Sequence, residues 1–135
     1  MNNVTLIGRL TKDPELKFLQ GTGTAVTNFT LAIDKELSKD KKQEMESQGK
    51  PTADFINIVV WGRMAETSAQ YLKKGRRTAV QGRLQSRTYE DKNGVKRYVT
   101  EVVAERVEFI DWGDDNEQDD SIDGFKPINN DDIPF

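Results

Sequence analysis

Apolar and polar residues alternate along most of the chain, which is the pattern of strands that are buried on one face. Residues 29–34 follow this alternation, with Phe29, Leu31 and Ile33 at every second position. Residues 55–61 are rich in the β-branched and aromatic residues that favour strands. We expect strands at both places. The same patterns predict further strands at residues 4–10, 78–90 and 95–104, with a last short strand at 106–111.

Three other segments have the patterns of a helix, a loop and a turn. Residues 64–74 place apolar side chains on one side at helical spacing, and Gly75 follows as a C-terminal cap. Residues 35–53 are rich in Lys, Glu and Gln and contain a glycine and a proline, so we expect a long solvated loop. Residues 91–94 end in Asn-Gly, the pair that tolerates the positive φ of a tight hairpin turn.

The predicted order is strand, strand, strand, helix, strand, strand. A single helix between the third and fourth strands of a five-stranded barrel is the OB-fold layout. We therefore expect an all-β domain with one helix over residues 1–112. Residues 113–135 lack an apolar pattern and are strongly polar, so they cannot bury enough surface to offset chain entropy. They are predicted to form a disordered acidic tail.

The net charge of -3 conceals an uneven distribution. Residues 1–112 carry 19 Lys and Arg against 15 Asp and Glu, while residues 113–135 carry one Lys and eight acidic residues. A mildly basic body of +4 joined to a tail of -7 indicates two separate functions.

The composition excludes several kinds of chemistry. The chain has no Cys and no His, which removes disulfides, thiolate metal sites and the commonest general base. No apolar run approaches the ~20 residues of a membrane span, and the first residues lack the layout of a signal peptide. We therefore expect a cytoplasmic protein with no catalytic residue, no metal, no cofactor and no membrane partner.

Aromatic and basic side chains share faces on two predicted strands. Phe55 and Trp61 lie on one face of strand 55–61, whose other face is aliphatic. Arg83, Arg87 and Tyr89 lie together on one face of the next long strand. Such a surface suits a single nucleic-acid strand, because bases stack on flat rings and guanidinium groups meet phosphates. Core aromatics and a solvated arginine face are the alternative, and the residues alone leave both interpretations open.

The end of the chain has an unusual composition for an acidic tail. Asp131 and Asp132 precede three apolar residues, the last of which carries the terminal carboxylate. This pattern suits a pocket that takes the terminal phenyl ring and pairs basic groups with the carboxylates. The alternative is a frayed solubilising end, but we favour a partner-binding tip.

Short sequence motifs occur in a specific joint order through residues 1–112 and at the tip. They are found at residues 3–10, 13–15, 54–56, 60–62, 65–66, 71–75, 82–84, 87–89, 98–104 and 131–135. In these motifs the chain resembles the bacterial and phage single-stranded DNA-binding protein family. The resemblance covers nearly all of the predicted domain and the last five residues.

The resemblance implies an OB-fold core that assembles as a homotetramer with D2 symmetry. It implies sequence-independent binding and protection of single-stranded DNA in replication, recombination and repair, in the cytoplasm at the nucleoid. It also implies that the tip docks proteins of these processes. Together with the strand faces it predicts DNA-binding residues Phe55, Trp61, Arg63, Lys74, Arg83, Arg87 and Tyr89, and partner-binding residues Asp131, Asp132, Ile133, Pro134 and Phe135.

The sequence departs from the family pattern in two places. Many relatives carry a tryptophan just after the second strand, where residues 34–37 contain no aromatic residue. Two interpretations stay open: stacking is weaker at this place, or the Lys-rich residues 35–42 substitute by charge. The tail is about twenty residues long and lacks a Gly/Pro/Gln-rich linker, which argues against strongly cooperative clustering on DNA.

Two other functions are less consistent with the sequence. An enzyme could use a divalent cation at residues 119–120 or 131–132, but these carboxylates lie in the predicted disordered tail and no nucleophile–base pair is present. An OB-fold adaptor without nucleic-acid binding resembles the dimeric replication-restart relatives, which usually lack an acidic tail with an apolar tip.

Overall fold

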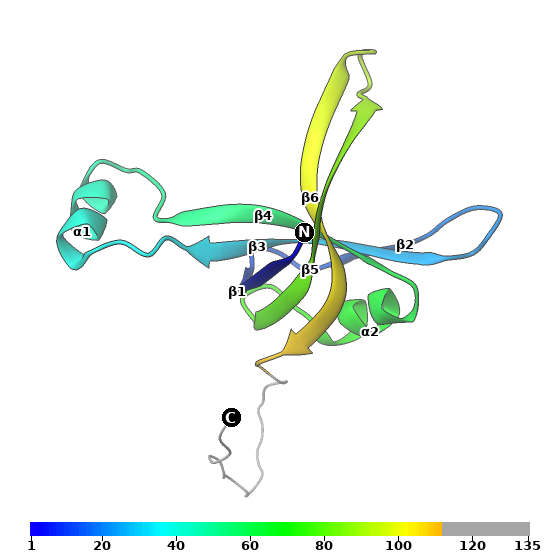
Figure 1. The fold of residues 1–135 in the computed structure, drawn as a ribbon, viewed down its shortest axis with the longest axis horizontal. Coiled ribbons are helices and arrows are strands. Elements are labelled where there is room, and N and C mark those ends of the chain that lie inside the picture. The colour runs from blue at the N-terminus through cyan, green and yellow to red at the C-terminus, as the bar shows by residue number, and fades with distance from the viewer. Residues whose placement is uncertain (112–135) are drawn as a thin grey trace, which may run out of the picture.

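The computed structural model describes residues 1–111, which form six strands and two helices (Figure 1). The elements are β1 (Val4–Leu10), β2 (Glu15–Phe18), β3 (Ala25–Asp34), α1 (Lys39–Ser47), β4 (Ala53–Trp61), α2 (Arg63–Tyr71), β5 (Arg77–Glu90) and β6 (Lys96–Phe109). The predicted strands and the helix before Gly75 are confirmed. The predicted tail and tip lie outside the described residues, so the boundary at 112, the disorder and the partner docking stay predictions.

Backbone hydrogen bonds close five of these strands into a ring. The strand order is β1-β5-β6-β4-β3-β2, and β1 also pairs with β3 through Arg9–Ala32 and Leu10–Leu31. The strand β2 lies outside the ring and extends the sheet at β3. Helix α2 follows the third strand of the ring and precedes the fourth. The predicted OB-fold order is therefore confirmed.

Aliphatic side chains from all five ring strands fill the core. Nearly complete burial is found for Leu10, Leu31, Ile58, Val60, Val80 and Val102. Helix α2 packs Ala65 against these side chains, and Thr27 Oγ1 donates a 2.7 Å hydrogen bond to the Ala65 carbonyl. Since one face of each ring strand packs into this core, the opposite face is the one that can carry a binding site.

The expected loop at residues 35–53 contains a helix that the sequence pattern did not predict. Figure 1 shows α1 at the far end of the β3–β4 hairpin, away from the ring. Ser38 caps it, with its Oγ accepting a 3.2 Å hydrogen bond from the Lys41 amide. No residue of α1 is buried, so the segment is solvated as expected, but Lys, Glu and Gln are good helix formers and the prediction of irregular structure was wrong.

A short strand was also missed. All four residues of β2 are exposed, so no alternation of burial marks them. The strand is held by backbone pairing with β3, in a register that sets Glu15 against Asn28 and Phe18 against Ala25. Residues 1–111 therefore form six strands and two helices, where a five-stranded barrel with one helix and a last short strand at 106–111 were expected.

The last two predicted strands form one continuous strand with a bulge. Gln81 pairs with Arg106 and Gly82 pairs with Ala104, so Glu105 is the extra residue in β6. A Cβ atom at position 82 would overlap the carbonyl oxygen of the preceding β6 residue, Val103. Glycine is therefore required where the two backbones approach most closely.

The two helices within residues 1–111 have nine residues each. Neither α1 nor α2 is long and apolar enough to cross a membrane.

Candidate nucleic-acid interface

The outer face of β4 carries two large aromatic side chains. Phe55 and Trp61 are 59% and 43% exposed, whereas Ile58 and Val60 on the opposite face are fully buried. This division between an aromatic outer face and an aliphatic core face is the one that alternation predicted. The six residue-to-residue steps from Phe55 to Trp61 span about 20 Å of strand, so the two rings lie near opposite ends of β4.

The outer face continues across β6 to β5. Val59 of β4 pairs with Val103 of β6, which in turn pairs with Arg83 of β5. Directly paired residues have side chains on the same face of a sheet. Further along β5, Arg87 and Tyr89 therefore lie on the same surface as the aromatic residues of β4.

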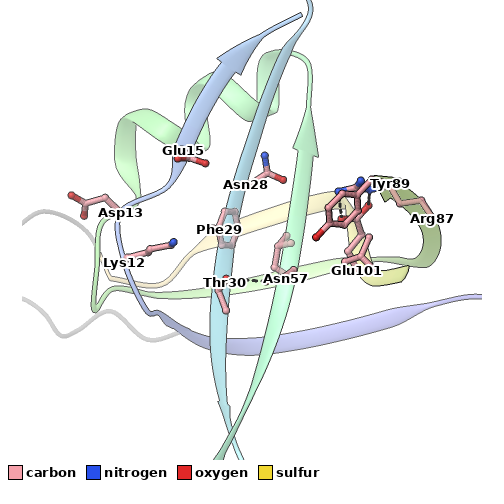
Figure 2. A pocket seen from close by; sticks show the side chains of 12 residues that line it. Lys12, Asp13, Glu15, Asn28, Phe29, Thr30, Asn57, Arg87, Tyr89 and Glu101 are labelled. Carbon is pink, nitrogen blue, oxygen red and sulfur yellow. Dashed lines mark hydrogen bonds and ion pairs between the residues drawn. The ribbon is translucent and has the colours of Figure 1, made fainter. Parts of the chain in front are cut away.

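Two adjoining hollows cross this surface. The larger has a volume of about 490 Å³, and Figure 2 shows side chains from β3, β4, β5 and β6 and from the segment between β1 and β2 around it. Its lining includes Lys12, Asp13, Glu15, Asn28, Thr30, Asn57, Arg87, Tyr89 and Glu101. The smaller, of about 300 Å³, is lined by Val26, Asn28, Val59, Trp61, Gln85, Arg87 and Glu101.

Three residues line both hollows, and they join the tryptophan end of the surface to the tyrosine end. These are Asn28, Arg87 and Glu101. Trp61 borders one hollow and Tyr89 borders the other. The two rings therefore flank one continuous polar path across the sheet, which we call the strand path.

Arg87 has the best-defined geometry on the strand path. Its Nε donates a 2.8 Å hydrogen bond to Oε2 of Glu101, whose side chain is only 3% exposed. This hydrogen bond to Glu101 raises the pKa of Arg87, against the opposing effect of burial. The guanidinium carbon also lies 5.8 Å from the centroid of the Tyr89 ring, within cation–π range. Arg87 therefore stays charged and is oriented by two neighbours.

The remaining predicted DNA-binding residues do not line either hollow. Arg63 is exposed at the start of α2, two residues after Trp61. Lys74 is exposed after α2, where its backbone amide donates a 2.9 Å hydrogen bond to Oδ1 of Asp13. Arg83 is half exposed on the shared face, and Phe55 lies at the far end of β4. The fold thus brings together Trp61, Arg87 and Tyr89 and arranges the other four around them.

Polar residues of the strand path were not predicted. Asn57 and Gln85 lie in the same alternation as Trp61 and Arg87, so the strand pattern could have identified them. Thr30 Oγ1 and Asn57 Oδ1 lie 2.9 Å apart. Glu101 could not be identified in this way, because residues 101–104 are all buried and show no alternation.

Residues 1–111 contain no group of three or more His, Cys, Asp or Glu side chains placed to hold a metal ion.

An OB-type ring whose outer face carries exposed aromatic rings and an arginine along a polar path is typical of proteins that take a single nucleic-acid strand. Comparison with known sequences identifies the family within that class. Residues 1–110 match the single-strand binding protein family, and the chain belongs to this family. Proteins of this family are binding proteins and not enzymes.

Curated relatives resemble the chain over its whole length. It is 53% identical to the single-stranded DNA-binding protein of Clostridium tetani over 135 residues, which cover all of this chain and 86% of the relative. It is 49% identical over 152 residues to single-stranded DNA-binding protein 3 of Clostridium acetobutylicum, and 50% identical over 141 residues to protein 2 of the same organism. Both of these alignments cover all of each chain.

Proposed function

We propose that this protein binds single-stranded DNA, independently of sequence, along the strand path between Trp61 and Tyr89. The observation that carries the proposal is the continuity of the two hollows, which place one exposed ring at each end and Arg87 between them. In this arrangement the rings stack on bases of the strand, and the guanidinium group contacts the strand between them.

Basic residues around the strand path supply attraction to the phosphates. Lys12 borders the larger hollow, and Arg63 follows Trp61 closely in the chain. Lys74 and Arg83 extend the basic surface beyond the hollows. A duplex hides the faces of its bases, so the exposed rings favour a single strand over a double helix.

The choice between single and double strands can be tested with a labelled oligo-dT and its oligo-dA duplex. Fluorescence anisotropy at two salt concentrations is expected to give single-strand binding at least about 100-fold tighter than duplex binding at the higher salt. Affinity for both should fall as salt rises, because phosphate contacts release counterions. Equal affinity for the two DNAs at the higher salt would exclude the stacking mechanism.

We also propose that the protein works as a homotetramer on DNA at the nucleoid. The family membership and the full-length similarity to the clostridial relatives support this assembly. Sedimentation equilibrium should give a mass about four times the 15.3 kDa of the chain. A monomer mass at micromolar concentration would contradict the proposal.

We propose a second role for the C-terminal tip, residues 131–135, in docking replication, recombination and repair proteins. Two carboxylates followed by a terminal apolar side chain suit a basic pocket with an apolar floor. Deletion of Phe135 is expected to abolish retention of such proteins on immobilised protein while leaving affinity for oligo-dT unchanged. Equal retention by the full chain and the deleted form would refute this role.

A further inference from the structure

One charged side chain among residues 1–111 is buried, and it lies on the strand path. Glu101 of β6 is 3% exposed and lines both hollows. Burial of a carboxylate is unfavourable unless the group is paired and hydrogen-bonded. An acidic group is also an unexpected neighbour for a bound phosphate backbone. Its position therefore calls for a function in the binding surface.

Both carboxylate oxygens of Glu101 face Arg87. Oε2 accepts hydrogen bonds from Arg87 Nε at 2.8 Å and from Gln85 Nε2 at 2.9 Å. Oε1 accepts a longer hydrogen bond of 3.4 Å from Arg87 Nη2. The carboxylate thus binds one edge of the guanidinium plane and leaves the Nη1 donors of Arg87 available to a ligand. Figure 2 shows Glu101, Arg87 and Tyr89 together at one side of the larger hollow.

A second arginine on the same face provides a comparison. Arg83 Nε lies 3.9 Å from Oε2 of Glu105, and both side chains are about half exposed. An exposed pair at this distance is screened by water and holds neither group in one orientation. The two arginines are about equally exposed, but Arg87 pairs at 2.8 Å with a buried carboxylate and Arg83 at 3.9 Å with an exposed one.

We propose that Glu101 is a positioning residue, which fixes Arg87 beside Tyr89 so that the guanidinium plane serves as a stacking and hydrogen-bonding platform for the DNA strand. This inference rests on the proposed function of the strand path. The nearby carboxylate compensates the charge of Arg87, so Arg87 acts through the fixed orientation of its guanidinium plane. Arg83 supplies charge to the phosphates without such orientation.

The substitution Glu101→Gln separates positioning from charge. Glutamine keeps the shape and one acceptor oxygen but removes the negative charge. We expect oligo-dT affinity to fall about tenfold at high salt, since Arg87 must then be ordered during binding. The loss of affinity should be smaller at low salt, because an uncompensated Arg87 can pair with a phosphate. The same contact should steepen the slope of log affinity against log salt by about 0.7. Glu105→Gln beside Arg83 is the matched control, with less than about twofold change at high salt.

Three outcomes of the Glu101→Gln measurement would overturn the inference. Tighter binding at every salt concentration means that the carboxylate only neutralises the surface. An equal loss at every salt concentration, with a lowered melting temperature, means a role in stability alone. Additive losses for Glu101→Gln and Arg87→Ala in the double variant mean that the two residues act independently, whereas the inference requires the double variant to bind no more weakly than Arg87→Ala.

A second pair of variants tests the inference without altering a buried residue. Arg87→Lys keeps the charge but removes the planar fork that Glu101 holds, so it should lose about tenfold in affinity. Arg83→Lys should lose less affinity than Arg87→Lys, because Arg83 contributes charge and not a fixed guanidinium plane. Equal tolerance of both substitutions would overturn the inference. If Arg87→Ala itself binds oligo-dT as tightly as the unaltered protein, the strand path is misplaced and the proposed function of this face fails with it.

Discussion

Replacement of Tyr89 by alanine isolates one stacking contact, because the chain offers a matched control on the same hairpin. Tyr89 is 48% exposed and borders the larger hollow, whereas Tyr98 is 78% exposed on the opposite face of the β5–β6 ribbon. The strand register shows that the two rings lie on opposite faces, since Tyr98 pairs with Thr88 and not with Tyr89. Neither ring belongs to the core, so both substitutions should leave the fold intact.

The expected magnitude follows from the loss of one stacked base. In single-strand binders, the proteins in which this range is known, stacking of one base on an aromatic ring contributes about 1–3 kcal/mol to the binding free energy. Tyr89→Ala should therefore weaken oligo-dT binding by about five- to 150-fold. Tyr98→Ala should change it by less than about twofold. The salt dependence of binding should be unchanged in both variants, because neither substitution removes a Lys or Arg side chain that could contact a phosphate.

Fluorescence anisotropy with a short labelled oligo-dT measures both variants directly. A short oligonucleotide limits the measurement to one binding event per site and excludes contacts between neighbouring proteins. Equal losses for Tyr89→Ala and Tyr98→Ala would refute the assignment of the binding face. An unchanged affinity of Tyr89→Ala would show that the ring does not stack on a base.

Three further outcomes are expected. Gly82→Ala should destabilise the protein by about 2–3 kcal/mol, because the new Cβ overlaps the Val103 carbonyl oxygen at the bulge. Burial acts to raise the pKa of Asp111, but hydrogen bonds and charge from Arg77 hold it below its ordinary value. Asp111→Asn should therefore lower stability by about 1 kcal/mol at neutral pH, and the difference should vanish as pH falls through the lowered pKa. Removal of residues 113–135, which carry a charge of -7, should tighten oligo-dT binding at low salt and less so at high salt.

Each of these outcomes has a direct measurement. Urea unfolding reports the first two, and the second needs neutral pH together with about pH 2 to follow the carboxylate through its titration. A pH-independent difference for Asp111→Asn would contradict the ion-pair explanation, and a fully stable Gly82→Ala would contradict the close backbone approach. Equal affinity of the full and shortened chains at low salt would show that the tail does not compete with DNA.

The ring strands can be predicted because alternating apolar and polar residues indicate which face of each strand is buried. This was sufficient for residues 29–34 and 55–61, where the core residues occur at every second position. The two elements that were not predicted, β2 and α1, lack such a pattern. The strand β2 is exposed on both faces and α1 buries no residue, so local hydrogen bonding and capping, which leave no hydrophobic pattern, determine them.

The candidate site was predictable only in part. Trp61, Arg87 and Tyr89 are placed by alternation on strands whose outer face is exposed. Glu101 lies on a strand that is covered on both faces at residues 101–104, so no period identifies it. Its pairing with Arg87 also depends on the register between β5 and β6, which includes the bulge at Gly82. Contacts of this kind arise from tertiary packing and have no local sequence signal.

The fluorescence of Trp61 reports directly whether DNA follows the strand path. The chain contains two tryptophans, so the substitution Trp112→Phe leaves Trp61 as the only tryptophan in the protein. Saturating oligo-dT is expected to quench its emission, because the 43% exposed indole on the strand path stacks on a base. Emission that stays unchanged at saturating oligo-dT would mean that the DNA binds on another surface.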